Sequence, residues 1–307
     1  MKKVRLALVF MLIAAICLSI SVFSASAENS APVAENLELR TYSGVSVGGR
    51  LCATDPEGDL ITFELTTDPV KGNVELESDG RFIYTPAEGK KGRDYFGFRA
   101  VDCNGSCSQE GTVIIKIEKQ KCAVSYSDMS GSSSEYAAVV LAEHGLFTGE
   151  QYGSEYVFEP DREVTRAQFL TMCMKLDGGN ILSGVRSTGF SDDDDIAVWL
   201  KPYVSTALMN GVISGYSDGA QAVFCPGDSI SCAEAAVMLD NILSVTDVIS
   251  TSAISDSDAV PAWAFQSVAN LAACRIIDTG IGSLDSPLTR ARAAEMLSNA
   301  VSLLEDR

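Results

Sequence analysis

The sequence predicts a multidomain protein in which an N-terminal all-β sandwich is followed by an all-α bundle of three tandem helical repeats. Residues 32–118 alternate between apolar and polar side chains, as half-buried strands do, whereas the chain after Lys121 repeats a helical pattern about every 64 residues. A third observation is an N-terminal segment that has the pattern of an export signal. The predicted boundaries are 1–27 for the signal, 28–121 for the sandwich, and 122–180, 187–247 and 251–307 for the three repeats.

The first 27 residues have the three parts of a secretory signal. A basic start precedes the uncharged apolar run 6–23, and Ala25-Ser-Ala27 fits a cleavage site of small residues. An uncleaved anchor helix is the competing interpretation, because the apolar run is nearly long enough to span a bilayer. We expect cleavage before Glu28, which leaves a mature chain without a membrane-spanning segment.

The chain is strongly acidic, with a formal net charge of −18 at pH 7. Removal of the signal takes away three basic residues and leaves about −21. Such a surface repels the phosphates of nucleic acid, so nucleic acid is excluded as a partner. It suits a soluble extracellular protein that works among divalent cations.

Cysteine and histidine usage argues against a zinc site and against nucleophilic catalysis. The nine cysteines form no C-x-x-C pair, and His144 is the only histidine. We expect most cysteines to be small, buried and reduced. The alternative concerns Cys103 and Cys107, which bracket a three-residue turn and could form a disulfide across a hairpin. We expect no enzyme, although a glycosidase pair among the 41 acids is the remaining alternative.

Short strands separated by turns predict the sandwich. The turn signals include Asp55-Pro-Glu-Gly-Asp59, Asp79-Gly80 and Asn104-Gly105. The predicted strands are 45–47, 60–65, 73–77, 81–84, 95–101 and 112–117.

The helical repeats share a start signal for their second helix. Thr165 with Gln168, and Ser231 with Glu234, have the spacing of capping boxes, in which a hydroxyl caps the helix and an amide or carboxyl three residues later bonds back. The third repeat has the cap, Thr289, without the acid.

Two arginines, Arg166 and Arg290, directly follow these caps. A cation at a helix N-terminus opposes the helix dipole, so its recurrence at one position suggests a purpose. A guanidinium beside free backbone N–H groups would receive a carboxylate. The alternative is an arginine that pairs with a nearby acid of the chain.

The repeats resemble S-layer homology modules. The resemblance rests on Phe190-Ser-Asp192, Trp199, Gly211 and Gly215 in the second repeat, and on Asp256, Trp263, Gly280 and Thr289-Arg-Ala291 in the third, and it covers residues 124–304. The first repeat departs from the pattern with Ser133 in place of tryptophan, and the second with Cys232 in place of arginine. The third departs with Arg275 and Arg292.

This resemblance implies a function. Three such modules would form a trimer-like prong whose grooves hold secondary cell-wall polysaccharide, in some cases bearing pyruvate ketals. Arginines would meet the carboxylate and tryptophans the sugar faces, although core packing is the alternative for both tryptophans. The implied glycan-binding residues are Arg166, Arg290, Trp199, Trp263, Asp192, Asp256, Gly149 and Gly215.

Residues 31–118 resemble a single cadherin-like or bacterial Ig-like repeat, through Ala53-Thr-Asp-Pro-Glu-Gly-Asp59. Asp55, Asp59 and Asp102 could gather at one end of the sandwich and hold calcium, which prefers several oxygen ligands. The alternative is a solvated turn that uses these residues for its backbone geometry.

Together these observations predict a secreted, non-catalytic protein of the cell surface, anchored non-covalently to the bacterial cell wall. The alternative is an adhesin or surface-assembly subunit whose β-domain binds a protein or glycan partner.

Overall fold

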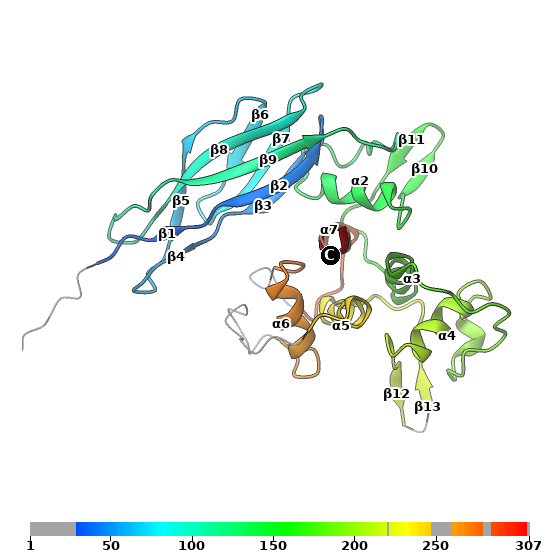
Figure 1. Cartoon of the computed structure of the whole chain (residues 1–307). Coiled ribbons are helices and arrows are strands. Elements are labelled where there is room, and N and C mark those ends of the chain that lie inside the picture. Colours follow the sequence, from blue (N-terminus) through cyan, green and yellow to red (C-terminus); the bar gives the residue numbers. More distant parts are fainter. Residues whose placement is uncertain (1–28, 220, 247–259, 279–283, 306–307) are drawn as a thin grey trace, which may run out of the picture.

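The computed structural model describes residues 29–219, 221–246, 260–278 and 284–305. The predicted signal and Asp256 lie outside these residues. A strand-rich part up to Glu118 is followed by a helical part, as the sequence predicts (Figure 1). Within the described ranges, none of the helices combines the length and apolar character that a membrane span requires.

The N-terminal part is a sandwich of two sheets. One sheet has the strand order β2-β9-β8-β5 and the other has the order β3-β7-β6. The pairing of β2 with β9 is parallel, and the other pairings in the two sheets are antiparallel. The strands are β1 (Val33–Ala34), β2 (Leu37–Tyr42), β3 (Val47–Arg50), β4 (Ala53–Thr54), β5 (Thr62–Thr67), β6 (Gly72–Leu76), β7 (Arg81–Pro86), β8 (Gly92–Val101) and β9 (Gly111–Glu118).

Apolar residues at every second position of the strands form the core of the sandwich. In β9, Val113, Ile115 and Ile117 are buried while the residues between them are partly exposed. They pack with Phe96 from the adjacent strand β8 and with Phe82 from β7 of the facing sheet, and the two rings meet edge to face with their centroids 5.2 Å apart. The sequence prediction missed β2, which pairs with the last strand of the domain rather than with a sequence neighbour.

The helical part contains three units of a short helix followed by a long one (Figure 1). In units 1 and 2 a small hairpin joins the two helices. The elements are α2 (Glu135–Glu143), β10 (Glu150–Tyr152), β11 (Glu155–Val157) and α3 (Arg166–Asp177) in unit 1; the 3-10 turn η1 (Asp193–Asp195), α4 (Lys201–Met209), β12 (Tyr216–Asp218), β13 (Gln221–Val223) and α5 (Cys232–Leu243) in unit 2; and α6 (Phe265–Ala273) and α7 (Arg290–Glu305) in unit 3.

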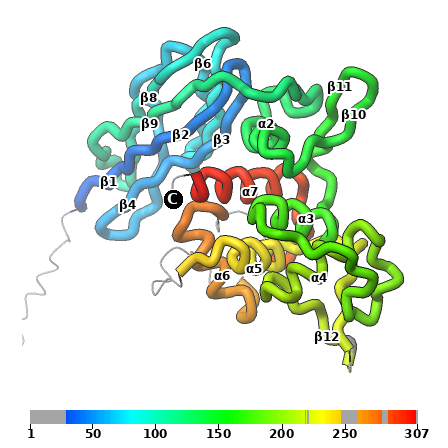
Figure 2. Tube along the Cα trace, turned by 45° about the vertical axis from the view of Figure 1, so that its right-hand side comes forward, coloured from blue at the N-terminus to red at the C-terminus, as the bar shows by residue number. Residues whose placement is uncertain are grey.

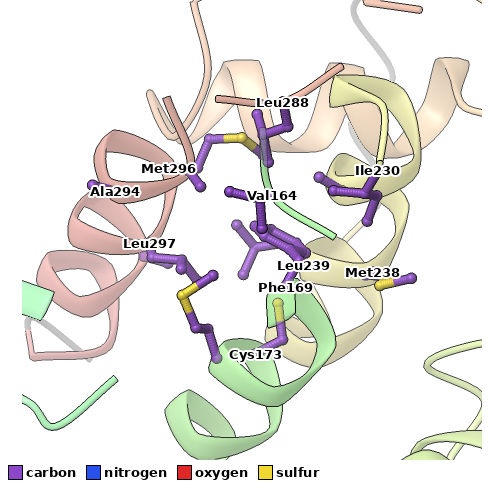
Figure 3. Close-up of a cluster of buried hydrophobic side chains, with 14 of the residues drawn as sticks. Val164, Phe169, Cys173, Ile230, Met238, Leu239, Leu288, Ala294, Met296 and Leu297 are labelled. Carbon is purple, nitrogen blue, oxygen red and sulfur yellow. The ribbon is translucent and has the colours of Figure 1, made fainter. Parts of the chain in front are cut away.

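The three units close into a ring through their backbones. The N–H of Val164 donates to the carbonyl of Leu288 at 2.9 Å, Leu288 donates to Ile230 at 2.8 Å, and Ile230 donates to Val164 at 3.0 Å. These residues precede the three long helices, and their side chains meet in one apolar cluster (Figure 3). Each unit therefore contributes one equivalent residue to the centre, and unit 3 completes the ring.

The sandwich lies against the helical part rather than apart from it. Strand β3 runs beside α2 in both views (Figure 2). Tyr42 and Val45, which come from the sandwich, belong to the apolar cluster of the helical part, while Tyr136 of α2 packs against both clusters. The two parts therefore share buried apolar surface.

Candidate functional site at the junctions of the units

The caps of the long helices have the geometry that the sequence predicts. The Thr165 hydroxyl accepts from the N–H of Gln168, and Ser231 accepts in the same way from Glu234; both capping boxes are complete. The Thr289 hydroxyl accepts from the N–H of Arg292 at 3.3 Å, so the third cap also forms. The chain turns into each long helix at an equivalent position, and this brings the following residue to a junction between units.

The first N–H groups of the long helices are not free. Arg166 donates its N–H to the carbonyl of Asp228 in unit 2 at 2.9 Å, and Arg290 donates to that of Arg162 in unit 1 at 2.8 Å. The N–H of Cys232 donates to Ser286 in unit 3 at 3.2 Å. The expectation of free backbone donors for a carboxylate is therefore wrong, because each helix start bonds to the next unit of the ring.

Arg166 is buried at the junction of units 1 and 2, with 4 % of its surface exposed. Its Nε donates to the carbonyl of Phe224 at 2.9 Å, and a terminal nitrogen lies 3.4 Å from a carboxylate oxygen of Glu234. The guanidinium carbon lies 4.2 Å from the ring centroid of Tyr216. The tyrosine hydroxyl in turn bonds the same carboxylate of Glu234. The arginine thus ties the hairpin and the long helix of unit 2 to unit 1.

Arg290 holds the junction of units 3 and 1 in the same manner, and it is also 4 % exposed. One terminal nitrogen donates to the carbonyl of Phe158 at 2.9 Å and to Glu159 at 3.1 Å, while the other lies 3.3 Å from Glu150. The guanidinium lies over the ring of Phe147 at 4.9 Å. Both arginines therefore pair with acids of the chain, the alternative that the sequence left open; their role toward a ligand stays a prediction.

The third junction has Cys232 in place of an arginine. Its side chain is 4 % exposed, and burial raises the pKa of the thiol. The N–H of the next residue, Ala233, donates to the carbonyl of Leu284 at 2.9 Å, so the backbone contact between units 2 and 3 persists without the ion pair.

The two tryptophans are exposed, so the core-packing alternative is wrong. Trp199 and Trp263 stand two residues before the short helices of units 2 and 3, and each is 62 % exposed. The Trp199 ring has a lateral neighbour in Tyr203, with ring centroids 6.5 Å apart. Large aromatic surface left open at equivalent places is typical of a binding surface.

The carboxylate of Asp192 accepts hydrogen bonds from the backbone in this structure. Its two oxygens accept from the N–H groups of Phe224 at 2.9 Å and Cys225 at 2.7 Å. Asp128 does the same for Phe158 and Glu159 in unit 1. Sequence reasoning missed this pair of backbone hydrogen bonds, although Asp128 and Asp192 occupy equivalent positions of the repeat.

Gly149 and Gly215 allow a close approach of backbone. Both have positive φ angles, 69° and 72°. A Cβ at Gly215 would lie 2.4 Å from the ring of Phe190, and one at Gly149 would lie 2.5 Å from the carbonyl oxygen of Val157. These glycines seat the hairpins against the units, and their part in glycan binding stays a prediction.

The predicted calcium ligands act as turn residues in the structure. Asp55 accepts from the N–H groups of Glu57 and Asp59, both at 3.0 Å, and Asp102 accepts from those of Asn104 and Ser106. In the described ranges, no group of three or more acidic, histidine or cysteine side chains could hold a metal ion. All eight described cysteines, Cys103 and Cys107 included, are free thiols.

The fold and its junctions define a two-part protein, an immunoglobulin-like sandwich packed on a closed ring of helical repeats. The family comparisons agree: residues 29–119 match the bacterial cadherin-like domain, and residues 125–170 and 189–236 match the S-layer homology domain. The chain is an S-layer homology protein with an N-terminal cadherin-like domain.

Two curated relatives match parts of the chain. Cell surface glycoprotein 1 of Acetivibrio thermocellus is 29 % identical over 126 residues, which is 38 % of this chain and 5 % of that protein. Amylopullulanase of Thermoanaerobacterium thermosulfurigenes is 25 % identical over 270 residues, 86 % of this chain and 13 % of that protein. The chain thus spans only a small part of the length of either relative.

Two solved structures each resemble about a third of this chain. The SrpA adhesin of Streptococcus sanguinis has 18 % identity and a TM-score of 0.25, covering 32 % of this chain and 67 % of that one. Human protocadherin-24 EC1-2 has 14 % identity and a TM-score of 0.25, covering 30 % and 56 %.

Proposed function

We propose that this chain is a non-catalytic protein of the bacterial cell surface, held non-covalently on the cell wall by its helical units, which bind secondary cell-wall polysaccharide. The observation that carries this proposal is the equivalent placement of Trp199 and Trp263, both 62 % exposed, at the start of two short helices. The matches to the S-layer homology domain and to a cell surface glycoprotein support it.

An exposed indole contributes little to the fold, yet its flat apolar face suits the apolar face of a sugar ring. Two such faces on one rigid ring would act together on one polymer, because the second contact forms at high effective concentration. The net charge of the chain favours uncharged sugar faces over polyanionic stretches.

In this proposal Arg166 and Arg290 hold the two junctions that attach unit 1 to the tryptophan-bearing units 2 and 3. Their guanidinium groups are 4 % exposed and already bonded to acids and carbonyls. A pyruvate ketal on the polysaccharide would therefore have to displace an existing partner such as Glu234 or Glu159.

Sedimentation with purified sacculi tests the proposal. Trp199→Ala and Trp263→Ala should each weaken binding about tenfold, a loss of about 1.4 kcal/mol, and the double variant should weaken it further. Tyr95→Ala provides the matched control, because Tyr95 is an exposed aromatic residue of the sandwich, 55 % exposed. Equal binding by the double variant and the wild type would contradict the proposal. Sacculi with and without pyruvate ketals show whether the ketal contributes.

A second candidate function gives the sandwich a binding role as an adhesin or assembly subunit. It is favoured by Leu60 and Val70, two apolar side chains of the sandwich that are 84 % and 80 % exposed. Leu60→Asp and Val70→Asp should then abolish binding to a second cell or protein while leaving sedimentation with sacculi intact. Partner binding that survives both substitutions would remove the basis for this candidate.

A further inference from the structure

We propose that the outer face of α2 is a permanent docking site for the chain's own β-sandwich, so that unit 1 is withdrawn from wall binding and only units 2 and 3 present ligand faces. The docking is inferred only from contacts between the sandwich and the helical part of this chain. The withdrawal of unit 1 rests on the proposed function.

Two backbone hydrogen bonds join the sandwich to the start of α2. The N–H of Gly48 in β3 donates to the carbonyl of Ser133 at 2.8 Å, and the N–H of Tyr136 donates to the carbonyl of Ser46 at 3.0 Å. A carboxylate oxygen of Glu135 accepts from the N–H of Ser46 at 3.0 Å. Glu135 is 9 % exposed, and this burial would be costly without such donors. The contact therefore satisfies polar groups on both sides.

A second group of contacts between the sandwich and unit 1 involves Glu143 at the end of α2. Its carboxylate accepts from the hydroxyl of Tyr42 at 2.7 Å and from the N–H groups of Lys121 and Cys122. The ring of Tyr42 lies 5.2 Å from that of Tyr136. One side chain thus ties the sandwich, the polar joint at residues 118–121 and the helix together, so the joint is not a free linker.

Ion pairs extend the docking to unit 3. Arg50 lies 3.0 Å from Asp278, Arg275 lies 3.5 Å from Glu35, and Arg40 lies 3.7 Å from Glu305. All are exposed pairs and contribute little individually. Each pair joins a charged side chain of the sandwich to one of opposite charge on the helical ring. Together the three pairs favour one orientation of the docked sandwich.

The face of α2 that contacts the sandwich has an equivalent in unit 2, and there it is exposed. A shift of 66 residues carries Ser133 to Trp199 and Glu143 to Met209. Trp199 is 62 % exposed and Met209 is 74 % exposed, so the face that bears the sandwich in unit 1 is open and apolar in unit 2. Trp263 opens the equivalent position of unit 3. Unit 1 has exchanged the aromatic residue for the small Ser133, against which Gly48 packs.

A larger side chain in place of Gly48 should disrupt the docking. A Cβ at this position would lie 2.5 Å from the Cβ of Ser133, and its three nearest atoms all belong to Ser133. Gly48→Leu should therefore separate the parts without a clash inside the sandwich. Gly227→Leu is the matched control, because a Cβ at Gly227 meets nothing within 4 Å. Glu143→Ala is a second variant, which releases Tyr42 and the joint without adding bulk.

The experiment uses the full chain and two readouts. Trypsin should cut Gly48→Leu and Glu143→Ala after Lys119 or Lys121 at least about tenfold faster than the wild type or Gly227→Leu, because undocking opens the joint. Sedimentation of Gly48→Leu with sacculi should stay within about twofold of the wild type.

Unchanged trypsin cleavage in both docking variants would overturn the docking. A tenfold loss of sacculus affinity in Gly48→Leu, with the tryptophan faces intact, would overturn the withdrawal of unit 1. If the wild type itself fails to sediment with sacculi, the proposed function falls and the withdrawal with it, while the trypsin rates still decide whether the sandwich is docked.

Discussion

The backbone of Val164 donates a 2.9 Å hydrogen bond to the carbonyl of Leu288, and this bond joins the first helical unit to the third. The pair belongs to a cycle of three equivalent bonds, so no unit ends the series. The three long helices consequently share one apolar centre in which each unit buries its own residue (Figure 3).

The shared centre predicts that a change in unit 3 destabilises all three units. Leu288 is fully buried, and Leu288→Ala should lower the free energy of unfolding by about 2–5 kcal/mol. Leu304→Ala, at an exposed position of α7, should change it by less than about 1 kcal/mol. Denaturant unfolding followed by circular dichroism at helical wavelengths measures both. Loss of only part of the helical signal in Leu288→Ala would show that the units unfold separately.

Arg166→Ala and Arg290→Ala should destabilise the ring. Each substitution removes a buried guanidinium and leaves the acids and carbonyl it held without that partner, at a cost of about 2 kcal/mol. Cys232→Ala, at the equivalent position, should cost about 1 kcal/mol or less, since only a small buried side chain shrinks. Thermal unfolding of the three variants gives the comparison. Normal melting of both arginine variants, combined with lost sacculus binding, would instead make the arginines direct ligands.

Asp192→Ala should loosen the loop before α5. The substitution leaves the N–H groups of Phe224 and Cys225 without their acceptor, at a cost of about 1–3 kcal/mol. Asp192→Asn, which keeps one oxygen acceptor, should cost less. Amide hydrogen exchange at these two residues reports the effect directly, and unchanged protection in the alanine variant would contradict the assigned role.

The ion pair of Asp193 with Lys201 predicts a pH dependence in unit 2. The hydrogen bond from Lys201, at 2.6 Å, together with those from Thr188, lowers the pKa of Asp193 to about 2. A carboxyl whose pKa is lowered by folding stabilises the fold above its unfolded pKa of about 3.9, and this contribution is lost as the pH falls toward 2. Titration of the carboxyl by NMR should give the lowered pKa, and Lys201→Met should raise it. A pKa near 3.9 in the wild type would exclude the interaction.

Local features of this protein were predictable from sequence, whereas contacts between units were not. The cap at Thr165 depends on Gln168 three residues away, so a short pattern specifies it. The burial of Arg166 depends on Phe224 and Glu234, which only the closed ring brings near. The same holds for the docking of Gly48 on Ser133, because no local pattern in the sequence marks a contact between two domains.

The central claim is that the helical units hold this chain on the cell wall through wall polysaccharide. Sedimentation of the full chain with sacculi, before and after the polysaccharide is stripped from them, tests it most directly. We predict that the chain sediments with intact sacculi and stays in the supernatant with stripped sacculi. Equal sedimentation with both, or none with either, would contradict the claim.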